Sequence, residues 1–236
     1  MKVGIDGVLL GAWAHHASIS PKTVLDIGTG TGLLALMLAQ RFPLAKIDAV
    51  EIDKEAADQA SDNVQASPFA GQIQVFPNAI QAFQKSKEGD YDLIVSNPPY
   101  FSNSLLAPDE GRRLARHALA LSHKELLNCA GLLLAPQGQF CLILPWDIGR
   151  TFLKEAMRRG WSVYTSCSVQ PRPGRLPNRV LLQLGRTPAW DKPKEDQLCI
   201  YAAEKGKEWS EAFKHLTQDF YLSADDQGEQ KWPSER

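Results

Sequence analysis

The 236-residue sequence lacks the features of several protein classes. Its longest uninterrupted apolar stretch, around residues 33–39, is too short to span a bilayer, so we expect no membrane segment. The first residues resemble a signal peptide only weakly, because an aspartate stands where positive charge is needed. Its four cysteines show no CxxC spacing, so we expect no metal site and no redox pair. Dispersed thiols without an export signal suit a reducing compartment and predict a cytoplasmic protein.

A large net charge is also lacking, since 26 Lys and Arg face 27 Asp and Glu. The charges are unevenly distributed, however. Residues 1–100 carry 7 basic and 11 acidic residues, residues 101–180 carry 11 and 5, and residues 181–236 carry 8 and 11. The net values of −4, +6 and −3 predict either a face that prefers a polyanion or ordinary solvated charge on helices, and composition alone does not decide between them.

Apolar β-branched runs alternate with helix-patterned stretches from residue 22 to about residue 186. Strands are predicted over residues 23–27, 46–51, 72–77, 91–96, 138–144, 161–169 and 180–186. Helices are predicted over residues 33–41, 54–66, 124–134, 149–159 and around 209–218. This order favours an α/β fold with a mostly parallel sheet and helices on both faces, which binds ligands at the carboxyl ends of its strands. We expect one domain over residues 1–222, a surface linker over residues 187–196 and a polar tail over residues 223–236.

Glycines alternate in LDIGTGTG, between the first predicted strand and its helix. They are Gly28, Gly30 and Gly32, and their lack of a Cβ allows a ligand to approach the backbone closely. The spacing is not the G-x-G-x-x-G of a dinucleotide site, and no Gly-Lys-Ser/Thr follows, so a pyrophosphate is not expected. Glu51 ends the second strand, where a carboxylate can accept both hydroxyls of a ribose. A structural turn, and a helix cap at Asp53, are the simpler alternatives.

Asn97-Pro98-Pro99-Tyr100 follows the fourth predicted strand. Each of the first two residues precedes a proline and is therefore held extended, which fixes the direction of its carbonyl group. The Pro98 carbonyl and the Asn97 side-chain oxygen are then two fixed acceptors, which suit a planar amino group with its two hydrogens. Tyr100 offers a flat face on which a base can stack. A rigid loop that closes a strand is the alternative interpretation.

The order LDIGTGTG, VEID and NPPY resembles the class I S-adenosylmethionine-dependent methyltransferases that act on amino nitrogens. MKVGIDGVLLGAWA, GLLALMLAQ, SNPPYF and RLPNRVLL are similar to the bacterial tRNA (adenine-N6)-methyltransferases of the anticodon loop of a valine tRNA. The likeness extends to residue 222 and implies a Rossmann-like fold with a seven-stranded, mostly parallel sheet, a tRNA substrate and no metal. It also implies that the chain begins within the family's amino-terminal segment, so that part of the site wall is either missing or supplied differently.

The resemblance assigns roles to individual residues. It places S-adenosylmethionine against a set of polar and glycine residues, with Asp6 as the polar contributor from a segment that reads G-I-D-G here and usually G-T-D-G. The cofactor-binding set is Asp6, Asp26, Gly28, Gly30, Gly32, Glu51, Asn78 and Asn97. Asn78 stands where relatives usually carry an aspartate. The catalytic set is Asn97, Pro98, Pro99 and Tyr100.

The basic middle of the chain then predicts contacts with tRNA phosphates. The candidates are Arg112, Arg113, Arg116, Lys124, Arg172, Arg175 and Arg179. Three other functions stay open at this point. They are methylation of a glutamine amide in a protein, methylation of another nucleic-acid amino group, and a non-enzymatic S-adenosylmethionine-binding interaction module. The intact motif over residues 97–100 argues against the last, and Tyr100 in place of phenylalanine favours adenine.

Overall fold

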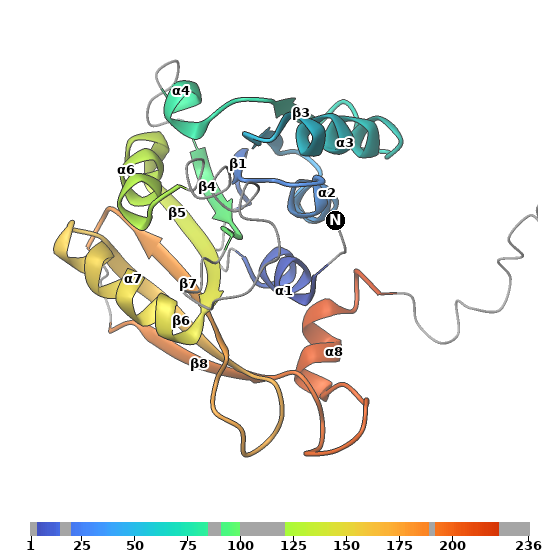
Figure 1. Cartoon of the computed structure of the whole chain (residues 1–236), viewed down its shortest axis with the longest axis vertical. Coiled ribbons are helices and arrows are strands. Elements are labelled where there is room, and N and C mark those ends of the chain that lie inside the picture. The colour runs from blue at the N-terminus through green and yellow to red at the C-terminus, as the bar shows by residue number, and fades with distance from the viewer. Residues whose placement is uncertain (1–3, 15–19, 85–90, 100–120, 189–191, 222–236) are drawn as a thin grey trace, which may run out of the picture.

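A single twisted sheet forms the centre of the computed structural model, which describes residues 4–14, 20–84, 91–99, 121–188 and 192–221 (Figure 1). In the described residues the strands are β1 (Thr23–Ile27), β2 (Lys46–Val50), β3 (Ile73–Phe76), β4 (Tyr91–Ser96), β5 (Leu134–Pro145), β6 (Ser162–Gln170), β7 (Arg179–Gly185) and β8 (Lys194–Cys199). The helices are α1 (Ile5–Trp13), α2 (Leu33–Arg41), α3 (Lys54–Gln65), α4 (Ile80–Gln84), α6 (His123–Leu133), α7 (Trp146–Arg158) and α8 (Glu211–Thr217).

The sheet has the strand order β3-β2-β1-β4-β5-β7-β6-β8. The pairs that join β3, β2, β1, β4 and β5 are all parallel, whereas β7 runs antiparallel to both β5 and β6. The mostly parallel α/β sheet predicted from the alternating pattern is therefore confirmed. The order reverses at β1 and β4, so a crevice is expected beyond the carboxyl ends of these two strands.

An eighth strand corrects two expectations. The sheet was expected to hold seven strands, and residues 187–196 were expected to be a linker, but β8 begins at Lys194 and pairs in parallel with β6. Its sequence, KEDQLC, is almost entirely polar because β8 lies at the edge of the sheet, where only Leu198 is buried. An edge strand needs few apolar residues, so the hydrophobic pattern did not reveal it.

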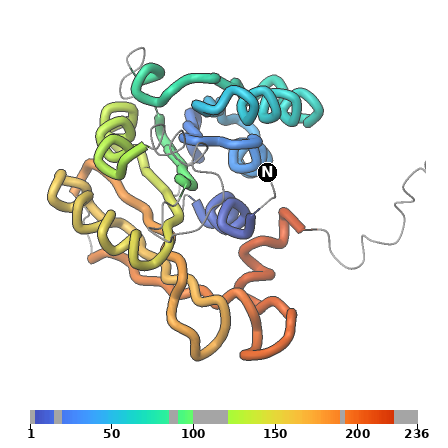
Figure 2. The backbone as a smooth tube through the Cα atoms, in the orientation of Figure 1, coloured from blue at the N-terminus to red at the C-terminus, as the bar shows by residue number. Residues whose placement is uncertain are grey.

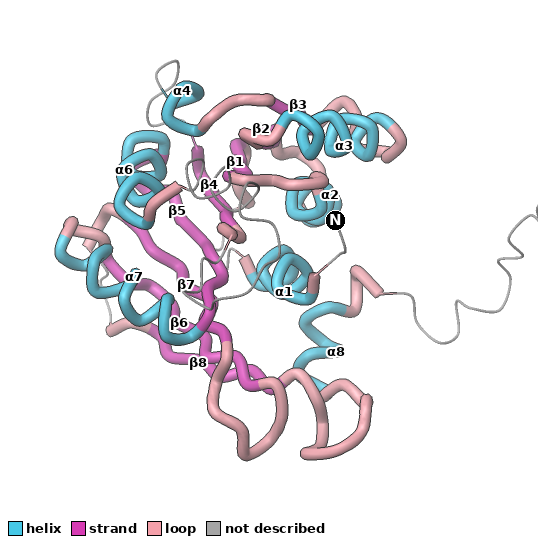
Figure 3. Tube along the Cα trace, viewed as in Figure 1, coloured by secondary structure: helices cyan, strands magenta, loops and turns pink. Residues whose placement is uncertain are grey.

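Helices cover both faces of the sheet (Figure 3), and each face has its own apolar layer. On one face Leu38 of α2 and Phe213 of α8 pack in one core cluster, whereas Leu127 of α6 and Phe152 of α7 belong to a second cluster on the other face. All four side chains are at most 1% exposed. Burial of both faces explains why the central strands are apolar runs rather than alternating ones. None of the described helices is long and apolar enough to cross a membrane.

Helix α1 was not predicted from the sequence. Seven of its nine residues are buried, so it shows no polar face and no amphipathic period. Its carboxyl end is held by Arg41 of α2, whose Nη1 donates to the carbonyl oxygens of Gly11 and Ala14, each at 2.7 Å. Burial lowers the pKa of this guanidinium from its usual value. Tertiary contacts thus stabilise a helix whose glycines disfavour it locally.

Candidate active site

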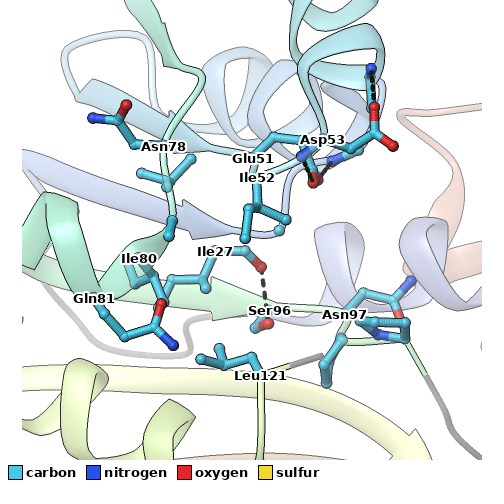
Figure 4. Close-up of a pocket in the computed structure, with 17 residues that line it drawn as sticks. Ile27, Glu51, Ile52, Asp53, Asn78, Ile80, Gln81, Ser96, Asn97 and Leu121 are labelled. Atoms are coloured by element: carbon cyan, nitrogen blue, oxygen red, sulfur yellow. Dashed lines mark hydrogen bonds between the residues drawn. The ribbon is translucent and has the colours of Figure 1, made fainter. Parts of the chain in front are cut away.

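A cavity of about 830 Å³ opens at the carboxyl ends of β1, β2, β3 and β4 (Figure 4). Its described lining residues are Ile27, Gly28, Gly30, Val50, Glu51, Ile52, Asp53, Ala56, Asn78, Ala79, Ile80, Gln81, Ser96, Asn97, Pro98, Pro99 and Leu121. The volume lies within the usual range for small-molecule sites, roughly 300–1,000 Å³. The cavity therefore brings together the turns that follow the first four strands, which are the segments that the sequence predicts to carry function.

The glycine turn after β1 forms one side of this cavity. The backbone N–H groups of Gly28 and Thr29 donate to the carbonyl of Val50 at 2.8 and 3.1 Å, which ties the turn to the end of β2. Gly28 has a φ of +74°, and a Cβ placed there would meet no atom within 4 Å. The turn thus needs glycine for its backbone conformation and leaves open space in front of it. Gly32, with a φ of +86°, caps α2 and does not line the cavity.

Asp26 lies beneath the glycine turn and is fully buried, not among the residues that line the cavity. Its Oδ2 accepts a hydrogen bond from the Thr29 hydroxyl at 2.5 Å, whereas its Oδ1 has no hydrogen-bond partner among the described residues. Burial is the main reason that the pKa of this carboxyl is raised from 3.8 to about 7; the Thr29 hydroxyl acts in the opposite direction, and the nearby Glu51 carboxylate adds to the rise. The structure thus gives Asp26 a place behind the turn.

Glu51 stands at the end of β2 and joins two walls of the cavity. Its Oε2 accepts from the backbone N–H of Gly30 at 2.9 Å, and its Oε1 accepts from the N–H of Asp53 at 3.0 Å. A carboxylate has about four acceptor positions, so each oxygen retains capacity for a ligand hydroxyl. The two backbone bonds hold the carboxylate in one orientation before any ligand arrives.

Asp53 acts as the N-cap of α3, as the simpler alternative held. Its side chain accepts from the backbone N–H of Ala56 at 3.0 Å. Farther along α3, the Asn63 side chain donates to the carbonyl of Thr31 at 2.9 Å. Helix α3 therefore supports both the second turn and the glycine turn.

Apolar side chains form the remaining walls, and the sequence did not single them out. Ile52 is 42% exposed although it is large and apolar, and this exposed face borders the cavity. Ile80 at the start of α4 and Leu121 before α6 lie across from it (Figure 4). Two apolar surfaces that face each other across a cavity suit a flat aromatic ring. The only signal for Ile52 in the sequence was its position directly after Glu51.

The Asn-Pro-Pro segment follows β4 and closes the other end of the cavity. The Ser96 hydroxyl donates to the carbonyl of Ile27 at 2.9 Å, which fixes the end of β4 against the end of β1. Asn97 is half-buried and Pro98 is buried, and both line the cavity. Asn97 lies at the end of the cavity opposite Asn78 (Figure 4). Tyr100 lies outside the described residues.

Asp6 does not line the cavity, in contrast to its expected place. Its Oδ2 pairs with Nε of Arg179 at 2.9 Å, and both side chains are largely buried, with exposed fractions of 16% and 29%. The pair joins the start of α1 to the start of β7. Arg179 was expected to contact RNA phosphates, but the structure engages it with this carboxylate.

The other predicted RNA-contacting residues fall into three groups. Arg112, Arg113 and Arg116 lie outside the described residues. Lys124 is exposed in the first turn of α6, three residues beyond Leu121 of the cavity. Arg172 lies over the ring of Tyr201, and Arg175 is exposed.

The charge of the cavity restricts its ligands. Glu51 and Asp53 are the charged residues among the described lining residues, and none of these is a lysine or arginine. Carboxylates without cations disfavour a phosphorylated ligand and suit one that carries positive charge and hydroxyl groups. No group of three His, Cys, Asp or Glu side chains is placed to hold a metal ion in the part of the chain that the structure describes.

The sheet order and the crevice at β1 and β4 define the Rossmann-like fold that class I methyltransferases have. A predicted O-methyltransferase from Agrobacterium tumefaciens has the same fold, with a TM-score of 0.68 and 16% identity, over 90% of this chain and 95% of that one. A ribosomal protein L11 methylase from Lactobacillus delbrueckii has a TM-score of 0.52 and 19% identity, over 79% of this chain and 81% of that one.

Sequence comparison places the chain within this class. Residues 8–145 match the family described as methyltransferase small domain, and the chain belongs to that family. A relative from Serratia proteamaculans is 48% identical over 94% of this chain and 84% of its own length, and one from Parabacteroides distasonis is 45% identical over 94% and 91%. Both are named tRNA1(Val) (adenine(37)-N6)-methyltransferase.

Proposed function

We propose that this protein transfers a methyl group from S-adenosylmethionine to the exocyclic N6 of an adenine in the anticodon loop of tRNA. The identity to relatives that are named for adenine 37 of tRNA1(Val) supports this substrate. The observation that carries the proposal is the position of Asn97 and Pro98, at the end of the same cavity that the glycine turn borders. A tRNA substrate also supports the cytoplasmic location that the sequence predicts.

The cavity fits S-adenosylmethionine in both shape and charge. Gly28 leaves open space for the ligand, which a side chain at this position would occupy. Glu51 presents a fixed carboxylate to the two ribose hydroxyls. Ile52 and Ile80 would enclose the adenine, with the Asn78 amide at its polar edge. When bound, S-adenosylmethionine supplies an electrophilic methyl group on a positively charged sulfur, and the cavity's two carboxylates suit that charge.

Asn97 and Pro98 would position the substrate amine. The side-chain oxygen of Asn97 and the carbonyl of Pro98 can each accept one hydrogen of an adenine amino group. Pro98 has no N–H of its own, so it offers only an acceptor. These two bonds favour a pyramidal nitrogen whose lone pair is free to react. Positioning of this kind can lower the activation barrier of a bimolecular reaction by about 7–11 kcal/mol, and no strong base is required.

Access to the amino group requires the target base to leave its stack. The target base would enter the cavity at Asn97 edge first, so the nucleotide must be flipped or already unstacked. An RNA loop permits this more readily than a duplex does. This requirement favours the anticodon loop over double-stranded DNA as the substrate.

Methyl transfer from labelled S-adenosylmethionine tests the proposal. Total tRNA, total DNA and ribosomal proteins are each incubated with the wild type and with Asn97→Ala. We expect label in tRNA alone and a loss of at least about 100-fold in the activity of the variant, because Asn97 holds the substrate amine. The variant should still bind S-adenosylmethionine, because the glycine turn and Glu51 remain in the cavity. Asn128→Ala, in α6 and outside the cavity lining, is the matched control and should keep full activity.

Three results would contradict the proposal. Label in a ribosomal protein would instead support glutamine methylation, and label in DNA would support a DNA adenine substrate. Wild-type activity in Asn97→Ala would show that Asn97 does not hold the substrate amine.

A further inference from the structure

Two loops project together beyond the carboxyl edge of the sheet. Residues 171–178 connect β6 to β7, and residues 201–208 follow β8; we refer to the two as the docking tip. Because β6 and β8 run parallel to β5 and hence to β4, both loops leave the sheet at the same edge as the cavity. Figure 2 shows the two loops extending in the same direction from the ends of their strands.

Arg172 fastens the two loops to each other. Its guanidinium carbon lies 4.2 Å from the centre of the Tyr201 ring, and its Nη1 donates to the carbonyl of Ala203 at 3.1 Å. The backbone N–H of Tyr201 also donates to the carbonyl of Pro171 at 3.2 Å. The loops therefore form one surface at their bases rather than two independent ones.

Each loop has a preset backbone. Tyr201 and Trp209 form a β-bridge that closes the second loop, and the N–H of Ala202 donates to the carbonyl of Glu208 at 2.9 Å. In the first loop the N–H of Arg175 donates to the carbonyl of Arg172 at 3.1 Å. A surface of this kind loses little conformational entropy when a partner binds.

The docking tip presents unpaired positive charge. Arg175, Lys205 and Lys207 are exposed, and no hydrogen bond or ion pair joins their side chains to another described residue. Of the two acidic residues on the tip, Glu208 pairs with Lys214 of α8 at 3.5 Å. With Arg172, four cations face two carboxylates, one of which is already neutralised. Three cations on a preorganised surface, at the same edge of the sheet as the cavity, suit a phosphate backbone.

We propose that the docking tip binds the phosphates of the RNA that flanks the methylated nucleotide, an inference that rests on the proposed function. The target base enters at Asn97, and the RNA backbone continues along the strand ends to Arg175, Lys205 and Lys207. Arg172 positions these contacts by holding the loops together. The two lysines lie in the acidic segment over residues 181–236, so the distribution of charge along the sequence gave no indication of them.

Binding of an unmodified anticodon stem-loop RNA, measured by fluorescence anisotropy over a range of salt concentrations, tests the proposal. In Lys205→Ala/Lys207→Ala we expect the Kd for RNA to rise about tenfold at low salt. The slope of log K against log salt should fall by about two, because two phosphate contacts are lost. The KM for tRNA should rise while kcat at saturating tRNA stays within about twofold.

The matched control removes the same charge at the opposite edge. Lys22 and Lys46 are exposed at the amino ends of β1 and β2, so Lys22→Ala/Lys46→Ala should leave both Kd and salt slope unchanged. Equal losses in the two double variants, or an unchanged slope in Lys205→Ala/Lys207→Ala, would overturn the docking tip while the enzyme still methylates tRNA. A wild type that methylates no tRNA would overturn the proposed function itself.

Discussion

At the scale of the residue, Asp26 is the carboxylate that folding buries most completely among the described residues. It is the fully buried acidic residue among those described, one of its oxygens is without a partner, and burial raises its pKa to about 7. A carboxyl group in such a site is protonated over much of the acidic range in the folded protein, whereas in the unfolded chain it ionises near pH 3.8. The glycine turn is thus built over a group whose charge state depends on pH.

Asp26 should make the protein less stable as pH rises from about 4 to about 7. In this window the folded state keeps a proton that the unfolded state has lost, so the free energy of unfolding falls with pH, by up to about 1.4 kcal/mol per pH unit. Asp26→Asn cannot ionise and keeps an amide oxygen for the Thr29 hydroxyl. Urea unfolding at several pH values should therefore show that the free energy of unfolding of the variant increases relative to that of the wild type as pH rises. Asp58→Asn, at an exposed position, is the control, and parallel profiles for Asp26→Asn and the wild type would refute the assignment.

At the scale of the element, the sequence predicted a helix or strand correctly where its buried residues form a recognisable apolar pattern. The bounds of β1, α2 and β4 agree with the predicted ranges, because an apolar run flanked by glycine or proline leaves little choice of boundary. Helix α1 was missed because it is apolar on all sides, and β8 was missed because it is almost entirely polar. In both cases tertiary contacts, which periodicity does not report, decide the structure.

A close approach between α7 and β7 yields a prediction at this scale. Gly149 lies where an added Cβ would collide with Cγ1 of Val180. Gly149→Ala should destabilise the protein by about 1–3 kcal/mol, even though alanine favours a helix by up to about 1 kcal/mol. Denaturant unfolding measures the change. Val180→Ala should relieve part of the loss in the double variant, and Arg150→Ala, at the exposed neighbouring position, should change stability by less than about 0.5 kcal/mol.

At the scale of the whole molecule, the cavity is assembled from four turns that are separate in sequence. Gly28, Glu51 and Asn97 were predicted as site residues because each belongs to a recognisable local pattern at a strand end. The apolar walls at Ile80 and Leu121 were not, since their role arises only when α4 and α6 pack beside the strands. Asp6 is the opposite case. Its local pattern predicted a site residue, but its carboxylate pairs with Arg179 and does not line the cavity.

A ligand that contacts all four turns should stabilise the entire fold. At about 100 times its Kd, S-adenosylmethionine should add about 2.7 kcal/mol to the free energy of unfolding, which thermal denaturation records as a higher Tm. ATP shares the adenosine but carries phosphates, so the carboxylate-lined cavity should give it no comparable shift. Glu51→Gln should weaken the effect of S-adenosylmethionine. An equal Tm increase from ATP would show that the cavity does not select by charge.

The polar strand β8 also bears on how the molecule avoids aggregation. It forms one outer edge of the sheet, and such an edge exposes backbone N–H and carbonyl groups to which a strand from another molecule could add. Lys194, Glu195 and Asp196 place charge of both signs along its first half, with Lys194 and Asp196 paired at 2.9 Å. An incoming strand would have to strip water from these charges. The residues that made β8 look like a linker thus protect the sheet against edge-to-edge polymerisation.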